Sequence, residues 1–85
     1  MKEKKLVVRL QHGLQARAAT DFVQKASSFN SDVTIIKNER KAAAKSIMGV
    51  MAMAIRKGEE ITLIANGTDE QKAVASLEEF LSNKE

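Results

Sequence analysis

The sequence predicts an α+β fold, an open-faced two-layer sandwich in which three helices cover one face of a four-stranded antiparallel sheet. Four short segments have the alternation or the β-branched residues of strands with one buried face. Three other segments place their apolar residues at helical spacing. The segments follow in the order β-α-β-β-α-β-α. The apolar strand faces are all buried if the helices pack on one side of the sheet, which leaves the other side open to water.

The first predicted pair is a strand over residues 5–10 and a helix over residues 16–27. The strand alternates and places three apolar side chains on one side, namely Leu6, Val8 and Leu10. Residues 11–13, Gln-His-Gly, form a loop between the two elements. The helix carries one apolar stripe, made of Ala19, Phe22, Val23 and Ala26.

The middle of the chain predicts a hairpin and, later, a fourth strand. Residues 32–37 are rich in β-branched side chains and predict a strand. A tight turn at residues 38–39 then returns the chain, so residues 40–43 pair back as the third strand. Residues 60–65 predict the fourth strand, whose buried face consists of Ile61, Leu63 and Ala65.

The last helix follows a turn at Asn66-Gly67. Residues 68–71, Thr-Asp-Glu-Gln, match a capping box, in which the first and fourth side chains satisfy free N–H groups of the helix start. The predicted buried face of this helix consists of Ala73, Val74, Leu77, Phe80 and Leu81.

The helix between the third and fourth strands is more apolar than the core requires. It is predicted to begin at Ser46, a favoured N-cap residue, and to be closed by Gly58. Its large apolar side chains cover more than half of the helical wheel, whereas a core-facing helix needs a stripe of only ~100° or a little more. Val50 with Met53 or Ala54 supplies a sufficient core set. The remaining large side chains are Ile47, Met48 and Met51.

Those three side chains leave two alternatives open. They pack in the core with the others, or they form an exposed patch of the kind that binds a partner. Ser46 favours the second alternative, because a phosphate there would meet free N–H groups at the helix start without breaking the fold. Lys45 lies beside it. The pattern predicts Ser46 as a phosphorylation site next to a docking surface.

Length and composition predict one small domain over residues 1–85. The chain has no cysteine, which excludes disulfides and thiolate chemistry and suits a reducing cytosol. No apolar run approaches the ~20 residues of a membrane span, so we expect a complete cytoplasmic protein. Residues 1–57 hold 12 Lys/Arg and 4 Asp/Glu, a balance of +8, and residues 58–85 hold 2 and 7, a balance of −5.

This distribution of charge has two possible interpretations. The basic residues are solvated surface charge, or they form a face that meets an acidic partner. Direct nucleic-acid binding is not expected, because the chain has no Trp or Tyr to stack on bases. One histidine and scattered carboxylates give no metal-ligand spacing, and the four glycines form no phosphate loop. We expect no metal, no cofactor and no enzymatic activity.

The loop before the first predicted helix is a second candidate site. Residues 12–19, His-Gly-Leu-Gln-Ala-Arg-Ala-Ala, end a loop at a helix start and include Arg17. A helix N-terminus with a nearby Arg can hold an anion, although an ordinary surface Arg is commoner.

With these residues in view, the whole chain resembles the HPr family of the bacterial phosphotransferase system. The most specific match is residues 45–51, Lys-Ser-Ile-Met-Gly-Val-Met. In HPr proteins the loop carries a phosphoryl-accepting His followed by x-Arg-Pro-Ala. Here Gln15 replaces that His and Ala18 replaces the Pro, whereas Arg17 and Ala19 fit. A carboxamide has no basic ring nitrogen, so the resemblance implies a member without the sugar-transport phosphorelay.

A Gln at this position with an intact serine motif is similar to the catabolite-repression branch of the family. The resemblance implies that an HPr kinase/phosphorylase modifies Ser46, and that the product then binds the transcription factor CcpA as its corepressor. It assigns contacts with that partner to a set of surface residues: Gln15, Arg17, Lys45, Ile47, Met48 and Met51.

Two alternatives to this regulatory function remain open at this point. A phosphocarrier would need His12, the only histidine, to replace the missing acceptor. A plain interaction domain would have no switch at Ser46. Whichever function holds, the chain could also form a homodimer by exchanging the first strand, because the hinge at residues 11–13 is short and flexible.

Overall fold

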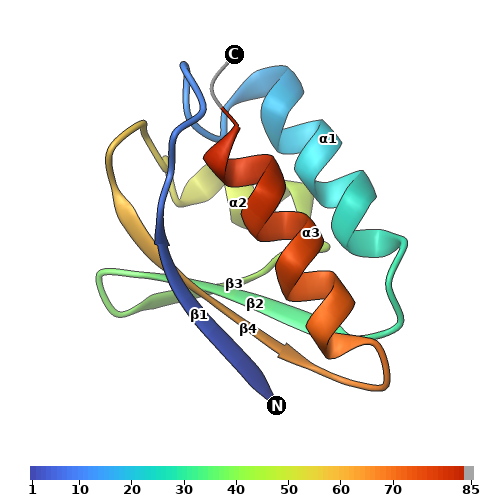
Figure 1. The fold of residues 1–85 in the computed structure, drawn as a ribbon. Coiled ribbons are helices and arrows are strands. Elements are labelled where there is room, and N and C mark those ends of the chain that lie inside the picture. The colour runs from blue at the N-terminus through green and yellow to red at the C-terminus, as the bar shows by residue number, and fades with distance from the viewer. Residues whose placement is uncertain (84–85) are drawn as a thin grey trace.

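The computed structural model describes residues 1–83 and confirms the predicted fold class (Figure 1). The antiparallel sheet has the order β1-β4-β2-β3, so the hairpin strand β3 lies at one edge and β1 at the other. The elements are β1 (Lys2–Val7), α1 (Ala16–Ser27), β2 (Asp32–Lys37), β3 (Arg40–Ala43), α2 (Ile47–Ala52), β4 (Glu60–Asn66) and α3 (Glu70–Ser82).

The three helices pack on one face of the sheet, and Figure 1 shows α1 and α3 running side by side above it. The core between the layers is closed by apolar side chains from every element except β3, whose Ala42 packs against its margin. The largest fully buried side chains are Phe22, Leu14, Ile35, Ile55, Ile61, Leu63, Leu77 and Leu81. The sandwich therefore has the single covered face that the alternation predicted.

The first strand exists, but it lies three residues earlier in the chain than predicted. It begins at Lys2 and ends at Val7, pairing with β4 from Lys2↔Ala65 to Val7↔Glu60. Its first four residues are charged and exposed, so they carry no apolar alternation to read. Charged residues, Lys above all, are common on edge strands because they oppose pairing with another chain. Val8 and Leu10 are buried as expected, but they lie in the segment after the strand.

The prediction that Gly58 closes the second helix is also wrong. Helix α2 ends at Ala52 with Met53 as C-cap, and Ala54 follows in a left-handed conformation with φ of 50°. The ammonium of Lys37 stabilises this end, because its Nζ donates to the carbonyl oxygens of Met53 at 3.0 Å and Ala54 at 3.1 Å. Basic groups are favourable at a helix C-terminus, where carbonyls lack helical partners. Ile55 is then free to enter the core.

Lys37 also joins this helix end to the start of β4. Its Nζ lies 2.9 Å from Glu59 Oε1, and Lys37 is mostly buried. The hydrogen bond from Lys37, followed by that from the Arg56 N–H, holds the pKa of Glu59 below its ordinary value.

The capping box predicted at residues 68–71 is wrong in its arrangement. The N-cap residue of α3 is Asp69, and its side chain makes no cap bond. Its carboxylate instead accepts the Asn30 N–H at 2.9 Å, the Ser31 N–H at 3.0 Å and the Ser31 hydroxyl at 2.5 Å. Glu70 Oε1 accepts the Gly67 N–H at 3.1 Å, so the first residue of α3 holds the turn that precedes the helix. Asp69 therefore fixes the loop before β2 to the start of α3.

The bonds to Asp69 predict a pH-dependent contribution to stability. The Ser31 hydroxyl and then the Asn30 N–H hold the pKa of Asp69 below its ordinary 3.8 in the folded state. A lowered folded-state pKa gives stability that is present above the unfolded pKa and lost as pH falls through the folded pKa. In urea unfolding, the stability difference between the natural protein and Asp69→Asn should be constant from pH 7 to about 5 and shrink below 3.8.

The variant is the matched reference, because Glu59 and Glu70 are present in both proteins. Their contributions to the pH dependence of stability therefore cancel in the difference. A difference that stays constant down to the lowest pH at which both proteins fold would contradict this role for the carboxylate.

Candidate functional site

Ser46 lies where the sequence predicts it, at the N-cap of α2 with extended backbone angles, and it is exposed. Its Oγ accepts the Gly49 N–H at 3.1 Å. A side chain on Gly49 would sit only 3.2 Å from that Oγ, so glycine leaves room around the hydroxyl. The Ser46 backbone is held on both sides, by Ala43 O at 3.0 Å and by Val50 N at 2.9 Å. The site is an accessible hydroxyl on a fixed backbone.

The exposed apolar surface predicted beside Ser46 is present. Ile47, Met48 and Met51 are 37%, 81% and 50% exposed, and these three residues are called the α2 patch below. Val50 and Met53 are buried and supply the predicted core set. Contiguous exposed apolar side chains often mark interaction sites on small proteins.

Lys45 does not extend freely beside Ser46. Its Nζ donates to the Phe29 carbonyl at 2.9 Å, which joins the start of α2 to the loop after α1. Helix α2 itself contains no charged residue, and no acidic side chain lies in its first turn. In the segment directly before the helix, residues 40–46, the charged side chains are those of Arg40, Lys41 and Lys45, which are exposed and all positive. A negative group on Ser46 therefore meets no like charge within these segments.

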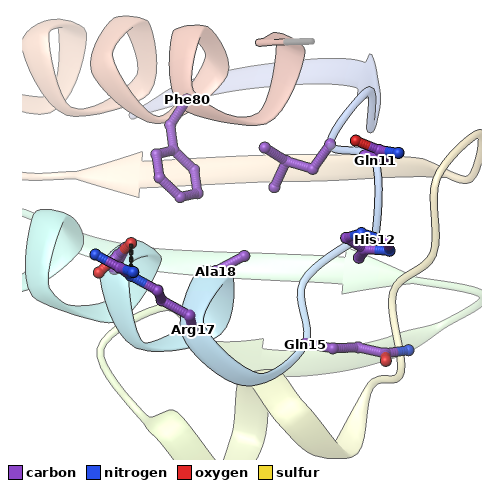
Figure 2. A pocket seen from close by; sticks show the side chains of 9 residues that line it. Gln11, His12, Gln15, Arg17, Ala18 and Phe80 are labelled. Atoms are coloured by element: carbon purple, nitrogen blue, oxygen red, sulfur yellow. Dashed lines mark ion pairs between the residues drawn. The ribbon is translucent and has the colours of Figure 1, made fainter. Parts of the chain in front are cut away.

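The second candidate site is a pocket of about 590 Å³ between the loop at residues 10–15, the start of α1 and the end of α3. Figure 2 shows the half-buried Phe80 pointing into it from α3, with His12 and Gln15 on the loop side. Phe80 also contacts the core, with its ring centroid 6.0 Å from that of Phe22. The pocket has an apolar floor and a polar rim.

The side chains of the two predicted residues of this pocket, Gln15 and Arg17, point in different directions (Figure 2). Gln15 is the N-cap of α1, but its side chain makes no cap bond and is exposed. The Arg17 guanidinium, 95% exposed, lies 4.0 Å from the carboxylate of Asp21 one turn along the helix. In Figure 2 the Arg17 side chain points away from both Gln15 and His12. The ion-pair partner of Arg17 is therefore Asp21 and not the Gln15 carboxamide.

The loop and the segment after α2 are joined by direct contacts. Leu14 N donates to the Ile55 carbonyl at 2.9 Å. Gly13 has φ of 67°, and a Cβ there would collide with the backbone of residues 55–56. Gly13 is therefore needed both for its left-handed conformation and for the close approach. These contacts connect the two candidate sites through the backbone.

Two contributors were missed from the sequence. Phe80 was assigned only to the core face of α3, although it also lines the pocket. Lys37, which bonds the end of α2, was counted only as a strand residue. Its place two residues after Ile35 on the core-facing side of β2 was an available signal, because a charge at such a position needs partners.

Within residues 1–83, no group of His, Asp and Glu side chains could hold a metal ion. The same part of the chain contains no helix with the length and hydropathy needed to cross a membrane.

Comparison with known proteins identifies the group to which this chain belongs. A family model described as the PTS HPr component phosphorylation site matches residues 2–83. The chain is 49% identical over 84 residues to the HPr-like protein Crh of Bacillus subtilis, covering 99% of both chains. It is 49% identical over the same length to Crh of Halalkalibacterium halodurans, covering 99% of this chain and 100% of the other.

Solved structures agree in fold. HPr of Bacillus anthracis superposes with a TM-score of 0.93 at 41% identity, covering 94% of this chain and 95% of the other. The crystal structure of Crh from Bacillus subtilis, a dimer with a swapping domain, gives 0.79 at 48% identity, covering 100% and 98%. On the match of the family model and of these relatives, the chain belongs to the HPr family.

Proposed function

We propose that this chain is a regulatory phosphoprotein of carbon catabolite repression. An HPr kinase/phosphorylase phosphorylates Ser46, and the product binds the transcription factor CcpA as its corepressor. The observation that carries the proposal is the exposed Ser46 hydroxyl at the border of the α2 patch. The similarity to two proteins named Crh supports it.

The geometry of α2 suits a switch that adds charge without unfolding the helix. A phosphate brings about −1.5 to −2 charges and acceptor oxygens to a position where an oxygen already accepts the Gly49 N–H. Val50 and Met53 hold the other side of the helix in the core. Phosphorylation therefore changes the charge at the edge of the α2 patch, whereas the apolar contacts beneath it remain.

We assign partner contacts to two groups of residues. The first is the α2 patch together with Lys45, whose ammonium gives one hydrogen bond to the Phe29 carbonyl and has two further donors for a phosphate or a partner. The second is Gln15 and Arg17 at the other candidate site. Arg17 is available for this role because its side chain is 95% exposed and its pairing with Asp21 is loose at 4.0 Å.

The alternative function, a phosphocarrier of the phosphotransferase system, fits the site less well. The carboxamide of Gln15 cannot accept a phosphoryl group as an imidazole does. His12 lies on the exposed loop, and Figure 2 shows Arg17 directed away from it. We therefore propose no phosphorelay and no catalytic activity of the chain itself. The proposed partners place it in the cytoplasm, in agreement with the absence of cysteine.

Phosphorylation by purified Bacillus subtilis HPr kinase/phosphorylase with ATP tests the proposal. Intact-mass spectrometry should show the gain of one phosphoryl group on the natural protein and none on Ser46→Ala. The variant loses the bond to the Gly49 N–H, which should cost about 1 kcal/mol of stability, so it remains folded as a matched control. No gain of mass, or an equal gain on Ser46→Ala, would refute the Ser46 assignment.

The phosphocarrier alternative has its own decisive assay. Incubation with phosphoenolpyruvate and the first enzyme of the phosphotransferase system should leave the mass unchanged. An acid-labile phosphohistidine at His12 would establish the alternative function instead.

We further propose that two copies of this chain can exchange β1, as the swapped dimer of the Bacillus subtilis relative suggests. The exposed residues of β1 are held mainly by pairing with β4 and by two surface ion pairs, Lys4–Glu78 and the N-terminal amine–Glu70. Exchange would remake all these contacts between chains, so only the hinge at residues 11–13 would differ. Such exchange is a low-cost route to a dimer.

Cross-linking distinguishes exchange from other association. The chain has no cysteine, so Lys4→Cys with Glu78→Cys introduces one pair at the β1–α3 contact. A short bismaleimide should join these residues between chains in the dimer fraction and within one chain in the monomer fraction. Light scattering that finds only monomer across concentrations, or a dimer that cross-links only within chains, would contradict the exchange.

A further inference from the structure

We propose that the thioethers of Met48 and Met51 are a reversible oxidation site, and that oxidation by peroxides releases the partner from the α2 patch. This inference rests on the proposed docking role of the α2 patch. It adds a second covalent signal to the same surface, opposite in effect to phosphorylation of Ser46.

The exposure of the side chains and their place in the α2 patch together select these two residues. Met48 and Met51 are 81% and 50% exposed, whereas Met53, immediately after the same helix, is 7% exposed. Met48 and Met51 are three residues apart, so they lie on one face of α2. Met1 is also exposed, but it precedes β1, where its amine bonds Glu70, and it is not part of the α2 patch.

The composition makes thioethers the main targets for an oxidant in this protein. The chain has no Cys, Trp or Tyr. A protein without a thiol cannot sense peroxides through sulfenic acid or a disulfide, and methionine is then the sulfur group that oxidises reversibly. Two of the four methionines are placed in the surface that carries the proposed function.

The step is a two-electron oxygen transfer. A lone pair on the thioether sulfur attacks one peroxide oxygen, an S–O bond forms, and the O–O bond breaks. In hydrogen peroxide the leaving hydroxide takes up the proton of the transferred oxygen and departs as water. The sulfur is oxidised, the peroxide is reduced, and the product is the sulfoxide. Methionine sulfoxide reductases return the sulfur to the thioether.

The fold should tolerate this change, whereas docking should not. Both side chains already face water, and the groups that hold α2 in place are Ser46, Val50, Met53 and Lys37. A sulfoxide is polar, so a partner that covers it must remove its water without supplying a donor. A buried polar group without a partner costs enough to lower affinity about tenfold or more.

The test uses the full chain phosphorylated on Ser46 and hydrogen peroxide as the probe. Peptide mapping should show that Met48 and Met51 oxidise faster than Met53. Binding to Bacillus subtilis CcpA should weaken about tenfold after treatment, with the thermal unfolding temperature nearly unchanged. Methionine sulfoxide reductases with a thiol reductant should restore the affinity.

Each protein is compared with its own untreated sample, which allows a matched control. Met48→Leu with Met51→Leu keeps apolar side chains of similar volume without a thioether, so peroxide should leave its affinity at the starting value. Met53→Leu keeps both exposed thioethers, so peroxide should lower its affinity as it does that of the natural protein. If the untreated double variant binds CcpA too weakly for this comparison, the recovery of affinity in the oxidised natural protein after reductase treatment tests the inference instead.

Equal affinity before and after oxidation of Met48 and Met51 would overturn the inference, as would a loss that reductases cannot reverse. Oxidation of Met53 at the same rate would also overturn it, because selection by exposure would then fail. If the untreated phosphorylated protein does not bind CcpA, the proposed function is refuted. The oxidation switch, which depends on that function, is then refuted as well.

Discussion

A helix of six residues has too few internal hydrogen bonds to persist in water, so α2 depends on the groups that hold its two ends. Ser46 supplies the acceptor at the first turn, and Lys37 supplies the donor at the last carbonyls. Val50 and Met53 fix the inner side in the core. All of these contacts use the ends or the inner face, and the outer face is left to the α2 patch. The fold itself, rather than a partner, therefore sets the position of this surface.

The fold and the position of the α2 patch could be predicted because they depend on local patterns. Helix α1 has the bounds that its single apolar stripe indicated, and the hairpin of β2 and β3 followed from β-branched residues around a two-residue turn. The excess of apolar residues over one stripe left core burial and exposure both open for Met48 and Met51, with Ser46 favouring exposure, and both side chains are exposed.

The errors share a different cause, because each depends on a contact between distant parts of the chain. The charged start of β1 is a strand only because β4 pairs with it. Helix α2 stops before Ala54 where Lys37, seventeen residues earlier, bonds its carbonyls. Asp69 has the composition of a local cap but bonds Ser31 instead. The partner of a side chain in a tertiary contact leaves no periodic signal, so no window of the sequence could reveal these arrangements.

The central claim is that the charge at Ser46 controls what binds the α2 patch. Isothermal titration of CcpA with the unmodified protein and with the same protein phosphorylated on Ser46 tests it most directly. We predict that the phosphorylated form binds at least about tenfold more tightly, which corresponds to about 1.4 kcal/mol of binding free energy. Equal affinities for the two forms would contradict the account, even if Ser46 proved to be an efficient kinase substrate.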